Sequence, residues 1–135
     1  MAFGSTAIGF ASFAAVKLVG YTAAAWYIKR RIPGSSASPW HIGAVRTGIG
    51  ILAGISMVAF AEMLGFVRSE AAFYALLVPV RMGEWLLVLS LFFRDLDWRW
   101  PRSLGLAALG TVWSYVLDIP AIFAMFAMPG GAWIC

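Results

Sequence analysis

Two oppositely charged residues lie inside the apolar stretch Tyr74–Phe93. Arg81 and Glu84 are three residues apart and follow Pro79 closely. A charge at the centre of a membrane helix costs about 2.5–3.5 kcal/mol on insertion scales. Charged residues at this depth are rare, and they commonly mark substrate or ion pathways. The pair therefore needs a structural or a functional reason.

Other apolar stretches carry charges at comparable depth. Counting about 1.5 Å per helical residue places Lys17 and Asp118 near the bilayer midplane, level with the first pair. By the same count Glu62 lies about 10 Å to the outer side and Arg46 a similar distance to the inner side. The long side chain of Arg46 could reach the cytoplasmic surface from there. The interior charges comprise three cations and three anions, and this balance favours mutual pairing.

Ion pairs would explain these charges structurally. Arg81 and Glu84 can bond within one helix, because residues three apart share a helix face. Lys17 is expected to meet Asp118 or Glu62 across helices. Buried pairs of this kind can fix helix register without adding net stability.

The same charges also have a functional interpretation. Interhelical polar contacts in membranes contribute on average only about 0.6 kcal/mol to helix association. Helix association alone therefore does not explain why so many charges lie in the interior. Glu62, Glu84 and Asp118 are candidate catalytic carboxyls, since desolvation favours their protonated form and would allow proton exchange near neutral pH. Pro79 and Pro120 support a site, because each frees a backbone carbonyl close to a midplane charge.

Aromatic residues complete the candidate site. Trp85 follows Glu84 directly, and Trp113 and Tyr115 belong to the same stretch as Asp118. Their ring faces could stabilise a positive charge on a substrate. The predicted ligand-binding residues are Lys17, Glu62, Arg81, Glu84, Trp85, Trp113, Tyr115 and Asp118.

Metal and haem chemistry find no support in the residue counts. The chain has one cysteine, Cys135, and one histidine, His41. A multi-cysteine metal site and a bis-histidine haem site within one chain are therefore impossible. The sequence also lacks an HExxH motif and a phosphate-binding glycine loop. We expect neither a metal nor a cofactor.

Four membrane-spanning helices must position these residues. The chain has 135 residues, of which 62% are hydrophobic and 12% charged, whereas soluble domains are about 25% charged. A span needs about 20 apolar residues, so this length allows four spans and no soluble domain. We therefore predict an all-α membrane protein, a four-transmembrane-helix bundle that forms a single integral membrane domain over residues 1–135. The expected spans cover about 3–28, 40–67, 71–93 and 104–128.

Positive charges between the spans predict the orientation. Lys29, Arg30 and Arg31 directly follow the first span, and Arg94 and Arg99 follow the third. Short loops that carry such cations are retained in the cytoplasm. We therefore expect both termini on the non-cytoplasmic side, and we take a bacterial cytoplasmic membrane as the location. These loops explain the net charge of +4, so no nucleic-acid partner is expected.

Small residues and prolines predict how the second span begins and packs. Gly50 and Gly54 form a four-residue repeat that favours close approach of a neighbouring helix. Pro39 suits the first turn of a helix that starts at Ser38 or Trp40.

Three functions are compatible with these features. The first is binding of a small ion, solute or amphiphile at the midplane charges, above all for transport, in a homodimer or larger oligomer. The second is a metal-free isomerase or cyclase that acts on an isoprenoid- or lipid-like substrate with a carboxyl as general acid. The third is an accessory subunit whose charges pair with partner membrane subunits. Balanced charges beside two proline breaks favour the first.

Overall fold

The computed structural model describes residues 3–32, 34–63, 70–93 and 100–127, which form four α-helices. These are α1 (Phe3–Arg31), α2 (Pro39–Met63), α3 (Glu70–Phe92) and α4 (Trp100–Ala127). Each contains a stretch long and apolar enough to cross a membrane. The predicted all-helical fold with four helices of spanning length is confirmed. Residues 64–67 of the second predicted span and 128 of the fourth lie outside the described residues.

Ser38 caps the N-terminus of α2. Its hydroxyl oxygen accepts a hydrogen bond from the His41 backbone N–H at 3.2 Å. Pro39 is the first helical residue, where a missing N–H costs nothing. The helix begins within one residue of either predicted start, and the predicted place of the proline in its first turn is confirmed. Lys29 Nζ donates to the Ala37 carbonyl at 2.5 Å and ties the end of α1 to this connection.

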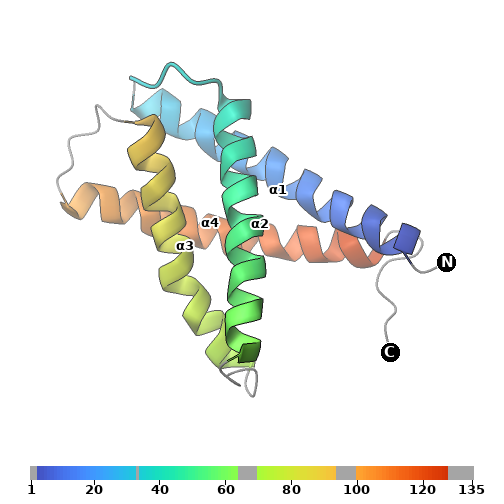
Figure 1. Ribbon diagram of the computed structural model, residues 1–135. Helices are drawn as coiled ribbons and strands as arrows, with labels where there is room; N and C mark the ends of the chain where they lie inside the picture. Colours follow the sequence, from blue (N-terminus) through green and yellow to red (C-terminus); the bar gives the residue numbers. More distant parts are fainter. Residues whose placement is uncertain (1–2, 33, 64–69, 94–99, 128–135) are drawn as a thin grey trace.

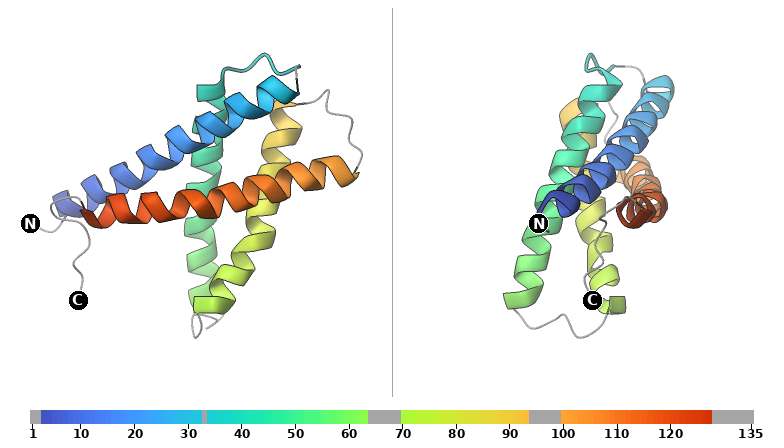
Figure 2. Two further views of the ribbon diagram at one scale, coloured as in Figure 1. Left: turned by 180° about the vertical axis from the view of Figure 1, so that it is seen from behind. Right: turned by 90° about the vertical axis from the view of Figure 1, so that its right-hand side faces the viewer.

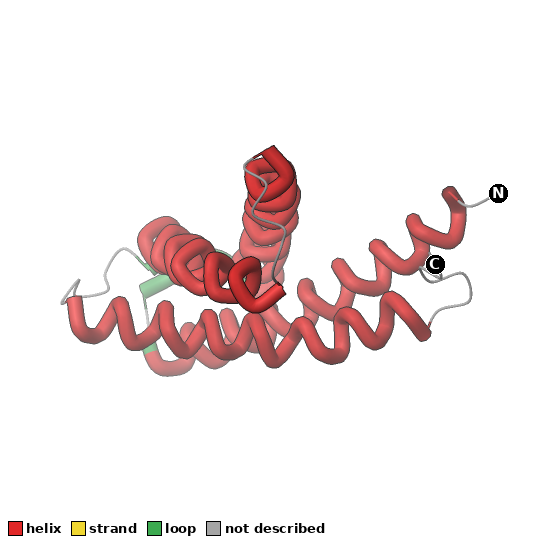
Figure 3. The backbone as a smooth tube through the Cα atoms, turned by 90° about the horizontal axis from the view of Figure 1, so that it is seen from below, coloured by secondary structure: helices red, strands yellow, loops and turns green. Residues whose placement is uncertain are grey.

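The helices form two pairs that cross each other. α1 packs on α2 and α4, and α3 packs on the same two helices. Figure 1 shows α1 and α4 lying across α2 and α3, not parallel to them. In Figure 3 α1 and α4 run lengthwise, whereas α2 and α3 point toward the viewer.

The two pairs diverge from the crossing. The N-terminal part of α1 and the C-terminal part of α4 extend together in one direction (Figures 1 and 2). The C-terminal part of α2 and the N-terminal part of α3 extend together in another. The helical bundle is therefore splayed and not parallel.

Buried apolar residues concentrate where the helices cross. One cluster comes from α1, α2 and α3 and extends to the ends of these helices: Ala25, Ile32, Ile42, Val88, Leu89 and Phe93. A second joins Tyr21, Trp85, Ala107 and Leu117 from α1, α3 and α4. Large apolar side chains such as Leu52 and Phe123 are exposed, as suits helices that face lipid.

The close helix contacts occur at glycines other than the predicted pair. A side chain at Gly43 would press on the Thr22 backbone, with a Cβ only 2.8 Å from its nitrogen. A Cβ added at Gly20 would clash with the side chain of Leu117 in α4, and one added at Gly110 would clash with Trp85 in α3. At Gly54, by contrast, an added Cβ would meet nothing within 4 Å, and at Gly50 it would meet only the Arg46 side chain. The predicted packing role of Gly50 and Gly54 is wrong, because this face of α2 borders a cavity.

Candidate functional site

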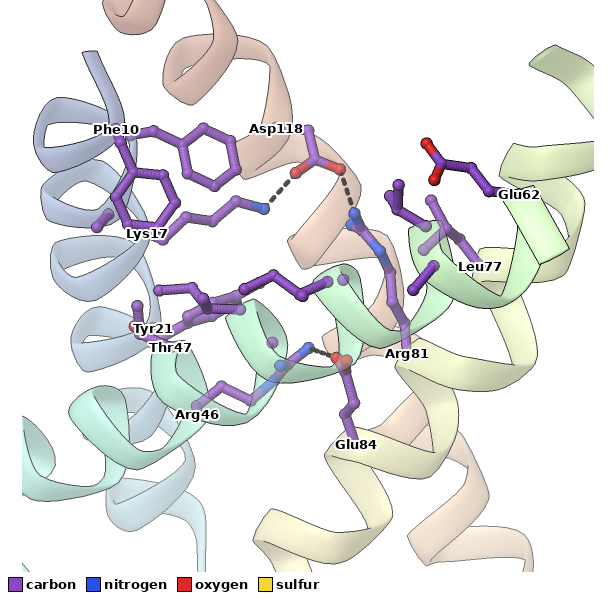
Figure 4. A pocket seen from close by; sticks show the side chains of 18 residues that line it. Phe10, Lys17, Tyr21, Arg46, Thr47, Glu62, Leu77, Arg81, Glu84 and Asp118 are labelled. Atoms are coloured by element: carbon purple, nitrogen blue, oxygen red, sulfur yellow. Dashed lines mark hydrogen bonds and ion pairs between the residues drawn. The ribbon is translucent and has the colours of Figure 1, made fainter. Parts of the chain in front are cut away.

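A cavity of about 580 Å³ lies between the diverging helix pairs, and all four helices contribute to its wall. Its volume is within the range of small-molecule sites, about 300–1,000 Å³. Figure 4 shows charged side chains from the four helices pointing into one region. Much of the remaining wall is apolar and includes Phe10, Phe13, Ile51, Ile55, Val58 and Leu77.

Asp118 of α4 binds two cations from different helices. Arg81 Nη2 lies 2.6 Å from one carboxylate oxygen. Lys17 Nζ contacts the other oxygen and lies 3.4 Å from the Ser114 carbonyl. Lys17 therefore pairs with Asp118, one of the two partners predicted for it. This arrangement links α1, α3 and α4 through one carboxylate.

Glu84 of α3 pairs with Arg46 of α2, at 2.6 Å between Oε2 and Nη2. The predicted bond between Arg81 and Glu84 is wrong, since each residue reaches a different neighbouring helix. The predicted extension of Arg46 to the surface is also wrong, because its side chain is 1% exposed. The rings of Tyr21 and Trp85 lie 4.7 and 5.1 Å from its guanidinium carbon and replace water around it.

Trp85 supports Arg46 from the core. Its Nε1 donates to the Ser114 hydroxyl at 3.0 Å, and Arg46 Nη2 lies 3.4 Å from the same oxygen. The Ser114 hydroxyl in turn donates to the Gly110 carbonyl at 2.9 Å. Trp85 is 2% exposed and is not part of the cavity wall. It holds the charged group in place and is not positioned to touch a ligand.

The other two predicted aromatic residues also support the site from outside the wall. The Tyr115 ring lies 4.3 Å from the Arg81 guanidinium carbon, and its hydroxyl donates to the Tyr74 carbonyl at 2.8 Å. Trp113 Nε1 donates to the Gly20 carbonyl at 3.0 Å and fastens α4 to α1. Both residues position helices or cations.

Glu62 lies apart from the other charges, although it lines the same cavity (Figure 4). Its side chain is exposed. It makes no ion pair with any residue in the described part of the chain. From Arg46, the wall on α2 continues through Gly50, Gly54 and Val58 to Glu62. The cavity thus has a charged end at Arg46 and a separate carboxylate further along α2.

The structure brings together five of the eight predicted ligand-binding residues in one wall: Lys17, Glu62, Arg81, Glu84 and Asp118. The site residues predicted from the sequence did not include Arg46, Tyr21, Phe10 or Phe13, which also line the cavity. The spacing of Arg46 with Gly50 and Gly54, one residue per helical turn, was the available signal for Arg46. Comparisons with protein-family models, curated proteins and solved structures give no match, so the function is inferred from this geometry alone.

Proposed function

We propose that this protein binds an amphiphile within the membrane, in the cavity between the diverging helix pairs. One observation carries the proposal: a single cavity joins a cluster of ion-paired side chains to a long apolar wall. Such a surface suits a molecule with a polar head and an apolar body, because each part meets its matching environment. A bare ion would leave most of this wall without a contact.

We further propose that binding is a step in transport of the amphiphile. The ion pairs connect all four helices, so a ligand that competes for one of these charges would also change how the helices are held together. The buried cluster of α1, α2 and α3 lies further along these helices than the charged residues, so passage of the ligand would require the helix pairs to move. Bistable packing of this kind is a common basis of gating.

The proposed setting is the cytoplasmic membrane of a bacterium, with both termini on the outer side. The basic residues at the end of α1 support this orientation, since cations beside a span favour retention in the cytoplasm. The exposed apolar side chains along all four helices support a lipid environment.

The two alternative functions receive less support from the geometry. A general acid would have to be a protonated carboxyl, but Glu84 and Asp118 each face a cation at ion-pair distance. Glu62, the third candidate, is exposed and lies apart from the other charges (Figure 4). An accessory subunit would use its charges to pair with partner chains. The ion pairs described here are formed within one chain.

Filling the cavity tests the proposal. Gly54→Leu adds a side chain where nothing lies within 4 Å and where the residue lines the cavity. Gly83→Leu is the matched control, since Gly83 of α3 is equally open but lies outside the wall. We expect Gly54→Leu to reduce amphiphile binding and flux in liposomes about tenfold or more, because the leucine and the ligand would compete for one space. Equal behaviour of the two variants would contradict the proposal.

A further inference from the structure

We propose that the ligand carries one anionic headgroup, of carboxylate or phosphate type, and that Arg46 and Arg81 bind it. This inference rests on the proposed function, because it names the class of amphiphile that the same cavity takes. Three independent features support it: the charge balance, the unmet hydrogen-bond donors and the position of Glu62.

The charged end of the cavity has more cations than anions. Arg46 pairs with Glu84. Asp118, however, is shared by Lys17 and Arg81. Three cations therefore face two carboxylates, which leaves one positive charge in surplus. An uncompensated charge is costly away from bulk water. A single anionic headgroup restores neutrality, whereas a neutral or cationic one does not.

Guanidinium donors at this end also lack acceptors. Among the described residues, Arg46 Nε, Arg46 Nη1 and Arg81 Nη1 are buried and have no hydrogen-bond partner. Arg46 Nη1 lies beside Gly50, whose added Cβ would stand 3.0 Å from it, and both residues line the cavity. Buried unmet donors are unfavourable, and anionic oxygens are the strongest acceptors for guanidinium groups. A carboxylate or phosphate near these nitrogens would satisfy them after a small side-chain adjustment.

Glu62 fixes the direction in which the ligand lies. From Arg46 to Glu62 α2 rises about 24 Å, at about 1.5 Å per residue. Gly50, Gly54 and Val58 line the cavity between them. The carboxylate of Glu62 repels an anion, so the headgroup binds at the Arg46 end and the apolar tail extends toward Glu62.

The test measures binding of chain-matched probes to the full-length protein in phosphatidylcholine nanodiscs, with empty nanodiscs as reference. The single-chain probes are dodecanoate, dodecyl phosphate, dodecanol and dodecylammonium. Phosphatidic acid and diacylglycerol form a two-chain pair that separates a bilayer lipid from a free amphiphile as the source. A hydrogen bond to a charged group corresponds to about tenfold or more in affinity. We therefore expect the anions to bind about tenfold or more tightly than the matched alcohols.

Two variants each remove one of the anion-binding groups without creating a new unpaired charge. Arg81→Gln removes the surplus charge and keeps the pair between Lys17 and Asp118. The double variant Arg46→Gln/Glu84→Gln removes one complete pair. Arg81→Gln should lose most of the preference for anions over dodecanol. The double variant keeps the surplus charge and loses only the donors of Arg46, so it should lose part of this preference. Arg102→Gln, at an exposed position outside the cavity wall, is the control for net charge and should keep the preference.

The outcomes separate this inference from the proposed function. If anions and alcohols bind equally and Gly54→Leu weakens both, the anionic headgroup is wrong and binding in the cavity stands. If the preference for anions persists in both arginine variants, Arg46 and Arg81 are not the headgroup site. If no probe binds above the level of empty nanodiscs, the inference and the proposed function both fail.

Discussion

At the scale of single residues, Asp118 has the largest predicted effect on stability. Its carboxylate is the shared partner of Lys17 and Arg81, and removing one member of a buried pair leaves the other charges uncompensated. We expect Asp118→Asn to lower the free energy of unfolding by about 3–5 kcal/mol. Glu62→Gln should change it by less than about 0.5 kcal/mol, because Glu62 is exposed and has no ion-pair partner among the described residues. Denaturant titration in mild detergent measures both, and equal losses would contradict the shared role of Asp118.

The identity of the buried charges could be predicted from the sequence, but most of their pairing could not. Charge type and depth follow from position in an apolar stretch, and they indicated that Lys17 could meet Asp118. Arg81 and Glu84 share a helix face by spacing, yet each bonds to a different helix. That choice depends on which helices lie beside α3, and local spacing carries no such information. Arg46 is similar, since it stays buried through contacts with other helices: the carboxylate of Glu84 and the rings of Tyr21 and Trp85.

At the scale of elements, apolar length predicted the four helices, whereas small residues did not identify the true contacts. A glycine repeat predicts close packing only if another helix covers that face. Gly50 and Gly54 face a cavity, while isolated glycines at 20, 43 and 110 allow the close approaches. The neighbour decides the role of each glycine, so sequence spacing alone gave the wrong pair.

The contact between α1 and α2 should therefore be sensitive at Gly43. A methyl group there would stand 2.8 Å from the Thr22 backbone nitrogen, so Gly43→Ala must push the two helices apart. We expect a loss of about 1–3 kcal/mol in the free energy of unfolding, the usual cost of overpacking. Gly48→Ala, on the same helix with open space around it, should be neutral or stabilising by up to about 1 kcal/mol. Denaturant titration of the two variants side by side checks this, and a neutral Gly43→Ala would show that the helices do not pack this closely.

At the scale of the whole molecule, the splayed arrangement creates the cavity. A parallel bundle of four helices encloses little space, whereas these two pairs diverge (Figure 2), and the cavity lies between them. The sequence predicted four spans and two basic connections, but it held no indication of divergence, because crossing angles arise from side-chain packing between helices. The ion-paired residues of the cavity wall come from all four helices.

The proposed orientation makes a prediction about which ends of the molecule face the cytoplasm. Ser36 is exposed in the connection between α1 and α2, beside the cationic end of α1. The chain's single cysteine, Cys135, is its last residue and should face the opposite side. In a Cys135→Ser background, Ser36→Cys should react with a membrane-impermeant maleimide in inside-out vesicles and not in right-side-out ones.

The unsubstituted chain supplies the reverse control, since Cys135 should react only in right-side-out vesicles. This contrast follows from the positive-inside rule, because moving the three cations at the end of α1 across the membrane is disfavoured. Replacing Lys29, Arg30 and Arg31 with glutamine should weaken the preference and give labelling from both sides. Labelling of Ser36→Cys from the outer side alone would show that the orientation in the membrane is the reverse of the proposed one. The Glu62 end of the cavity would then lie nearer the cytoplasm than the Arg46 end.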